Sequence, residues 1–205
     1  LLWTDYLNYP DGTSLALHSL SKLNGFIALP FVDALGHLAS LRILLLITFP
    51  IAGWGMYLLA HRYVERFWPA FLAGCIYAFC PHRMVRFNLE QIDITSSHWI
   101  PYYVLFLLIF LERNSVRAAF GAAVMAILTA LSAWYHAGHL VFITMFLGVY
   151  FLCTGRMQWK SRAFAGGLAV LVLVPIAALA VYLVPMFRDS LETESQHQDQ
   201  MTASL

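Results

Sequence analysis

Long apolar runs alternate with shorter polar stretches along most of this 205-residue chain. A helix needs about 20 apolar residues to cross the hydrocarbon core of a bilayer. Four runs are close to that length or longer, at residues 43–60, 118–135, 137–153 and 163–187. Two shorter runs, 67–80 and 99–111, border the same polar stretch. The pattern predicts an all-α, polytopic membrane helical bundle of about six membrane segments, two of them short.

The first 42 residues follow a different pattern. Residues 9–12 read Tyr-Pro-Asp-Gly, a turn signal with Pro at the second position and Gly at the fourth. Thr13 or Ser14 can then cap a helix. Apolar residues recur at helical spacing after this turn, as Ala16, Leu20, Leu23 and Ile27. This spacing predicts an N-terminal amphipathic helix at the membrane surface, which we expect to break at Asn24 and Gly25, and at Pro30.

These patterns divide the chain into three regions. We expect an outer loop with the surface helix at 1–42, a membrane helical domain at 43–187, and a polar outer-side tail at 188–205. The chain begins with Leu1 rather than Met, and its tail ends in polar sequence. We therefore expect it to be an internal part of a longer protein.

Composition agrees with a membrane protein and excludes other classes. Hydrophobic residues make up 60% of the chain and charged residues 11%, whereas an ordinary soluble domain has about 45–50% and about 25%. A soluble enzyme domain is therefore excluded. The net charge of +1 also gives no concentrated basic face of the kind that binds nucleic acid.

The charged residues sort between two sets of loops. The loops at 61–66, 112–117 and 155–162 are short and mainly basic. The other polar segments carry most of the acidic residues and seven of the eight histidines. The positive-inside rule places the basic set in the cytoplasm. We therefore expect any active site to face the outer side of the membrane.

The densest polar stretch is 82–98, between the two short apolar runs. Its candidate substrate-binding residues are His82, Arg83, Arg86, Glu90, Asp93 and His98. Short or interrupted apolar segments often border a binding site, where irregular backbone can lie below the surface in a protein-lined cavity. Positions 83 and 86 are helical neighbours, and arginine makes permanently charged, bidentate contacts with phosphate. The alternative is a solvated outer loop whose arginines touch lipid head groups.

A second motif, residues 134–139, predicts a very tight turn between two spans on the outer side. Tyr135 and His136 add to the candidate substrate-binding residues. His136 and His139 would share one face of a helix, so a metal pair is conceivable, although two histidines alone make a weak metal site. The alternative is an aromatic belt at the membrane interface.

The N-terminal outer loop supplies two candidate catalytic carboxylates, Asp5 and Asp11. A carboxylate at this face can act as a base or hold a divalent cation such as Mg²⁺ or Mn²⁺. Asp11 also has a simple local explanation, because Asp is common in Pro-Asp-Gly turns for backbone reasons.

Four sequence runs together resemble a known family. Residues 4–15, 73–83, 91–101 and 130–135 are similar to bacterial polytopic membrane glycosyltransferases of the GT-C type, within a similarity from about residue 4 to about residue 154. The resemblance implies a transferase that uses a polyprenyl-phosphate-linked sugar donor at the outer face of the bacterial inner membrane. It also implies an essential acidic residue in the first outer loop, after a first membrane helix that precedes this chain. The base is then Asp5 or a residue upstream of Leu1, and we expect this part of the protein alone to be inactive.

In such a reaction a carboxylate would deprotonate the acceptor hydroxyl. Arg83 and Arg86, with His82 or a divalent ion, would stabilise the charge that develops on the leaving phosphate. Two alternatives remain open: a transporter or flippase of a lipid-linked or anionic solute, and a non-catalytic membrane assembly subunit. The absence of charge at the centre of the apolar runs argues against transport, since ionisable residues in mid-membrane mark many transport paths.

Overall fold

The protein is described from a computed structural model that covers residues 3–4, 13–14, 21–155 and 161–203. Two short strands pair antiparallel, with Trp3 opposite Ser14, and the other regular elements are helices. In chain order the elements are β1 (Trp3–Thr4), β2 (Thr13–Ser14), α1 (Lys22–Leu35), α2 (His37–Val64), α3 (Phe67–Ala78), α4 (Pro81–Asn88), α5 (Ile92–Thr95), α6 (Ile100–Arg113), α7 (Val116–Ser132), α8 (Trp134–Cys153) and α9 (Arg162–Ala203). The predicted all-α membrane bundle is confirmed.

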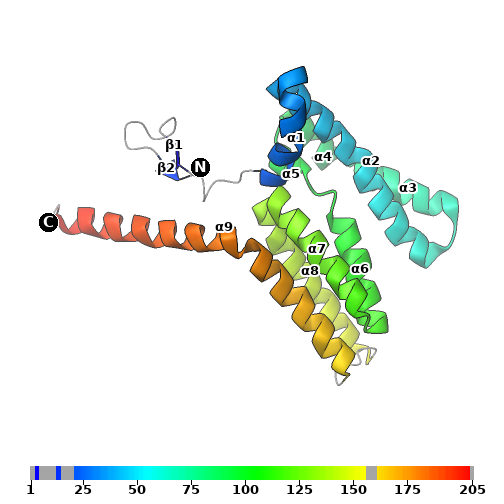
Figure 1. Cartoon of the computed structure of the whole chain (residues 1–205). Coiled ribbons are helices and arrows are strands. Elements are labelled where there is room, and N and C mark those ends of the chain that lie inside the picture. The colour runs from blue at the N-terminus through cyan, green and yellow to red at the C-terminus, as the bar shows by residue number, and fades with distance from the viewer. Residues whose placement is uncertain (1–2, 5–12, 15–20, 156–160, 204–205) are drawn as a thin grey trace.

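The helices form a bundle with a helical hairpin beside it (Figure 1). Helices α6, α7 and α8 and the first part of α9 lie side by side, while α2 and α3 form the hairpin and α2 also packs against α6. The C-terminal ends of α2, α6 and α8 lie at one end of the molecule. Helices α1, α4 and α5 and the start of α8 lie at the other, which we call the polar end. The basic loops at 61–66 and 112–117 thus lie at the end opposite the polar stretch 82–98.

Within the described residues, four helical stretches are long and apolar enough to cross a membrane: His37–Val64, Ile92–Arg113, Trp134–Cys153 and Arg162–Val181. The predicted run at 67–80 is indeed short, since α3 has 12 residues. The run at 99–111 is longer than predicted, because α5 and the following link extend it to a stretch of 22 residues. The run at 118–135 is shorter than predicted, because α7 ends at Ser132 after 17 residues.

Several N-terminal predictions were wrong. Thr13 and Ser14 form β2 rather than a helix cap, and α1 begins at Lys22, while Ala16 and Leu20 lie outside the described residues. Asn24 and Gly25 do not break α1, because the Asn24 amide is buried and donates from Nδ2 to Ser21 Oγ (2.8 Å) and to Ser96 Oγ (2.5 Å).

Pro30 does not break α1 either, and it lies on the exposed face of that helix. The break comes instead at Gly36, whose φ of 77° lies in the left-handed region that glycine adopts without strain. Helix α2 therefore starts at His37, inside the predicted outer loop. At the other end of the chain, α9 continues without interruption from the last span into the predicted polar tail.

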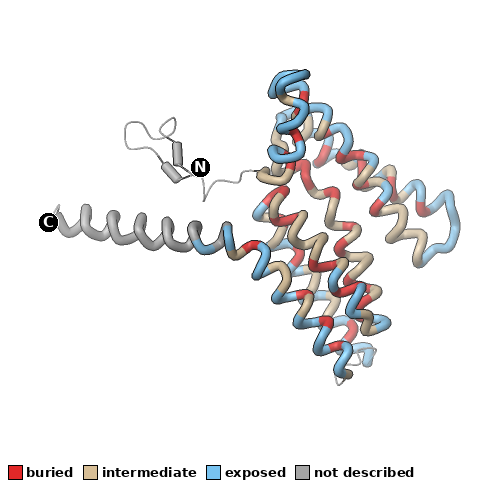
Figure 2. The backbone as a smooth tube through the Cα atoms, in the orientation of Figure 1, coloured by how far each residue is buried: buried red, intermediate tan, exposed pale blue. Residues whose placement is uncertain are grey.

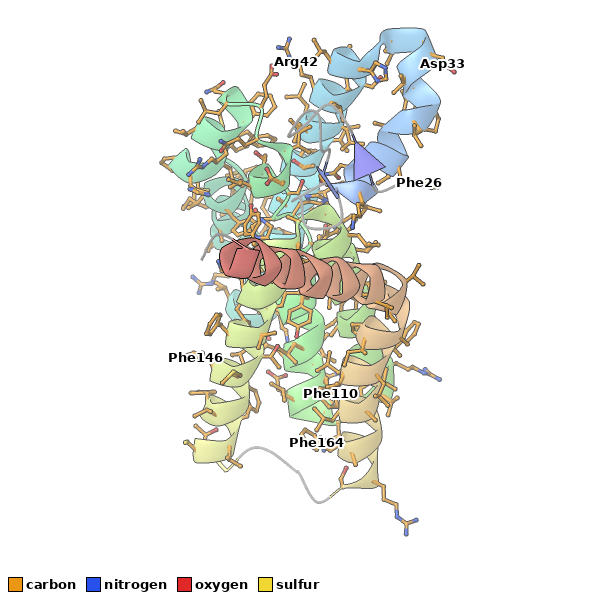
Figure 3. All side chains as sticks on the ribbon, turned by 90° about the vertical axis from the view of Figure 1, so that its left-hand side faces the viewer. Phe26, Asp33, Arg42, Phe110, Phe146 and Phe164 are labelled. Atoms are coloured by element: carbon orange, nitrogen blue, oxygen red, sulfur yellow. The ribbon has the colours of Figure 1, made fainter. Side chains whose placement is uncertain are left out.

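The apolar core lies between α6, α7, α8 and α9. Its buried members include Leu107 and Phe110 of α6, Ala119 and Ala122 of α7, and Phe164 of α9. The Phe110 and Phe164 rings stack with centroids 5.4 Å apart (Figure 3). Figure 2 shows that buried positions follow the facing sides of these helices. Small alanine side chains on α7 let its neighbours pack closely, which holds the polar end in a fixed arrangement.

Candidate functional site

The two polar motifs predicted from the sequence meet at the polar end of the molecule. Arg83 lies on α4, His98 and Trp99 on the link between α5 and α6, and Tyr135 and His136 in the first turn of α8. His98 lies close enough to Arg83 and to His136 to interact electrostatically with both. We call these five residues the polar centre.

The peripheral members of the predicted site surround the polar centre. Tyr135 interacts electrostatically with Asp93 and Arg86, and His136 interacts with His82. Arg86 Nη1 also donates to Gln91 Oε1 at 2.6 Å, which closes the turn between α4 and α5. Seven of the eight predicted substrate-binding residues are therefore gathered in one place.

Local structure explains how the chain presents these side chains. Pro81 occupies the first turn of α4, where a missing N–H costs nothing, and Arg83 follows as the buried residue of that short helix. The link between α5 and α6 is fixed by Tyr77 of α3, whose hydroxyl donates to the Ser97 carbonyl at 2.9 Å. Ala133 is extended and separates α7 from α8. The predicted turn near His136 thus lies three residues earlier, and His136 is helical.

Arg83 is the most unusual residue of the polar centre. It is only 2% exposed, and its Nη2 donates to Thr48 Oγ1 of α2 at 3.0 Å. Its guanidinium carbon lies 4.8 Å from the centroid of the Phe49 ring. Nε and Nη1 have no hydrogen-bond partner in the described part of the chain, and no carboxylate there forms an ion pair with Arg83.

Burial lowers the pKa of the Arg83 guanidinium below its usual value, but arginine remains protonated in proteins. A buried cation without an anionic partner is costly, because several kcal/mol of hydration are lost. Arg83 therefore has both the charge and the free N–H groups to bind an anion.

Other polar atoms of the centre also lack partners within the described residues. They are His98 Nδ1, Trp99 Nε1 and the Tyr135 hydroxyl, whereas the His136 ring lies within hydrogen-bonding reach of the Ile94 backbone. The Trp99 indole N–H can only donate, and the Tyr135 hydroxyl can donate as well. Each of these donors, like the free N–H groups of Arg83, can donate a hydrogen bond to an oxygen of an anion such as phosphate.

Glu90 is placed apart from the polar centre. It is exposed on the turn between α4 and α5, with a φ of 54°, and it forms an ion pair with Arg42 of α2. The Arg42 Nε to Glu90 Oε1 distance is 3.0 Å. Glu90 therefore serves the contact between α2 and the turn rather than the polar centre. The candidate catalytic residues Asp5 and Asp11 lie outside the described residues.

The described part of the chain offers no complete set of metal ligands. No three His, Cys, Asp or Glu side chains gather there in a way that could hold a metal ion. His136 and His139 do share one face of α8, with ring centroids 5.6 Å apart, as their spacing predicts. They remain a pair without a third ligand among these residues.

Sequence reasoning missed several residues of the site. Thr48 is the single Ser or Thr in the apolar run at 43–60, and a lone hydroxyl in such a helix is a usable signal. Asn24 looked like a helix breaker, but its buried amide joins α1 to Ser96 in the link. Ser21 adds a bond from its Oγ to the Ser132 carbonyl at the end of α7 (2.6 Å). Helix α1 is thereby fastened to the polar end.

Comparisons with protein-family models, with curated proteins and with solved structures find no match for this chain. What the chain can do chemically is therefore inferred from the polar centre. Its buried cation and its donors can bind and orient an anion at the end of apolar helices. His98, also 2% exposed, is near enough to Arg83 to interact with it electrostatically, and it can form a hydrogen bond to such an anion.

Proposed function

We propose that this chain is part of an integral membrane glycosyltransferase. It would transfer a sugar from a polyprenyl-phosphate-linked donor at the outer face of the bacterial inner membrane. The observation that supports this most is Arg83, a buried arginine with two free N–H groups and no anionic partner in the described part of the chain. The four sequence runs that resemble GT-C glycosyltransferases supply the reaction type.

A lipid phosphate fits the position of Arg83 better than a freely soluble anion. Helices α2 and α8 are long and apolar enough to cross a membrane, and Arg83 donates a hydrogen bond to Thr48, which lies well inside α2. A phosphate fixed to a hydrocarbon chain reaches such a depth without leaving the bilayer. A soluble anion would have to lose its hydration at the same place.

The chemistry follows from where charge develops. When the bond between the sugar and the phosphate breaks, negative charge grows on the leaving phosphate oxygen. Arg83 Nε–H and Nη1–H, with Trp99 Nε1–H, are donors that can stabilise this charge in a site of low dielectric constant. A carboxylate would take the proton of the acceptor hydroxyl. Asp5 and Asp11 are the candidates from the sequence, and Asp93 is the carboxylate that interacts with Tyr135 of the polar centre.

The test is sugar transfer by the full-length protein in liposomes. Polyprenyl phosphate carrying radiolabelled glucose, mannose or galactose is supplied separately, and labelled product is counted. Arg83→Met is expected to lower the rate by about 10²–10³, the loss seen when one transition-state donor is removed. Arg42→Met is the matched control, because Arg42 is an exposed cation at the same end.

Equal rates for wild type and Arg83→Met would contradict the assignment of Arg83. Movement of the labelled lipid across the bilayer without sugar transfer would favour the transporter alternative instead.

A further inference from the structure

A second feature of the molecule is an apolar groove between α2 and α3. It encloses about 450 Å³, within the usual range for a ligand pocket. Its walls include Phe49, Gly53 and Trp54 of α2, Phe71 and Cys75 of α3, and Phe79 just beyond α3. All of these are apolar or aromatic side chains, apart from the glycine. The groove therefore suits a hydrocarbon chain.

Close packing of two glycines lets the helices approach at this groove. A Cβ atom added to Gly74 would lie 2.6 Å from the Gly53 carbonyl oxygen, so a larger residue at this position would push the two helices apart. Aromatic side chains such as Trp54 and Phe71 then extend beyond the glycine contact on the two helices. The result is an apolar groove along the hairpin with aromatic walls.

Phe49 connects the groove to the polar centre. Its ring lines the groove and stacks on Phe79 with centroids 5.6 Å apart. The Arg83 guanidinium carbon lies 4.8 Å from the centroid of the same ring. One end of an apolar groove is therefore a single aromatic ring away from a buried cation without an anionic partner in the described residues.

We propose that the groove between α2 and α3 holds the single hydrocarbon chain of a lipid phosphate whose head group binds Arg83. This inference rests on the proposed function and adds where the lipid chain lies. Charge complementarity supports it, because the cation at the end of the groove needs an anion.

The test is photolabelling of the full-length protein in phosphatidylcholine liposomes. The probe is a polyprenyl phosphate with a diazirine in its chain, and adducts are mapped by mass spectrometry. We expect adducts on α2 and α3 along the groove, lost on addition of unlabelled polyprenyl phosphate. At ten times its Kd the competitor leaves about one site in eleven free, so labelling falls about tenfold.

Helix α8 supplies the reference for bulk lipid. Phe142 and Phe146 are each 72% exposed, and Phe146 points away from the bundle (Figure 3). Adducts on these residues should not respond to the competitor. Cys75→Phe fills the groove and should abolish competed labelling there. Gly148→Phe is the matched control, because a Cβ at that position of α8 meets nothing within 4 Å.

Several outcomes would overturn the inference. Labelling of α2 and α3 that no competitor reduces means that the groove takes only bulk lipid. Equal competition by phosphatidic acid means that a diacyl lipid fits as well. Cross-links between two copies through α2 and α3 mean that protein covers the groove.

The experiment also separates this inference from the proposed function. If competed labelling maps to another surface, the groove is not the lipid site, but the glycosyltransferase proposal still stands. If no surface shows competed labelling, and Arg83→Met transfers sugar at the wild-type rate, both the groove inference and the assignment of Arg83 are wrong.

Discussion

Replacing Arg83 with methionine is expected to stabilise the ligand-free protein while removing its response to a lipid phosphate. The buried guanidinium loses several kcal/mol of hydration, and its unsatisfied N–H groups, Nε and Nη1, account for about 1–3 kcal/mol of this each. Against this stand one hydrogen bond to Thr48, about 1.5–3 kcal/mol, and the contact with the Phe49 ring, up to about 2 kcal/mol. The free energy lost by burying the Arg83 guanidinium therefore exceeds the free energy that its contacts contribute.

Methionine suits this position because its neighbours accept an apolar side chain. Phe49 is aromatic, and Thr48 keeps its own hydrogen bond from Oγ1 to the Leu45 carbonyl at 2.6 Å. Replacing buried charged groups by apolar residues of similar volume has raised stability by about 1–4 kcal/mol. We expect a gain within that range for Arg83→Met.

The assay is denaturant unfolding in detergent micelles, with and without polyprenyl phosphate. The lipid should raise the unfolding free energy of wild type but not of Arg83→Met. Arg42→Met is the control, and its exposed ion pair should be worth about 0–1 kcal/mol. If Arg83→Met lowers the unfolding free energy by more than about 1 kcal/mol, the arginine has a structural partner and the reasoning fails.

Three further predictions concern packing, the surface helix and orientation. Gly74→Ala should destabilise the hairpin by about 1–3 kcal/mol, because its Cβ would meet a backbone oxygen of α2 at 2.6 Å. Gly148→Ala is the control, because its Cβ would enter open space and should not lower stability. Equal thermal unfolding of the two variants would refute the close contact. Asn24→Ala breaks the hydrogen bond that holds α1 on the link to α6, so amide exchange in α1 should become faster; unchanged exchange would mean that apolar packing holds α1. With the native cysteines removed, Asn88→Cys should react with an impermeant maleimide on intact cells and Arg113→Cys only after permeabilisation, and the reverse pattern would place the polar centre in the cytoplasm.

Much of the helical architecture could be predicted because apolar length is a strong signal in membrane proteins. Each predicted apolar run lies mainly on a helix. The ends were less certain, because polar residues can continue a helix beyond its apolar part. His37 to Arg42 extend α2 in this way, and α5 lengthens the span at 92–113 although polar Ser96 and Ser97 follow it.

The candidate site was predictable in its residues but not in its assembly. The motifs at 82–98 and 134–139 are far apart in sequence, and only the packing of α8 beside the α5–α6 link brings His136 to His98. Local rules misjudged Asn24, because a tertiary hydrogen bond overrides its tendency to end a helix. Glu90 was grouped with Arg83 by sequence distance, whereas its actual partner Arg42 lies 48 residues away.

The most direct test of the account is the affinity of the full-length protein for polyprenyl phosphate compared with polyprenol of the same chain length. Two charge-assisted hydrogen bonds from Arg83 are each worth about 1.5–3 kcal/mol, so wild type should prefer the phosphate by at least about tenfold. Arg83→Met should bind both lipids equally. A wild type without this preference, or a variant that keeps it, would contradict the claim that Arg83 binds a lipid phosphate.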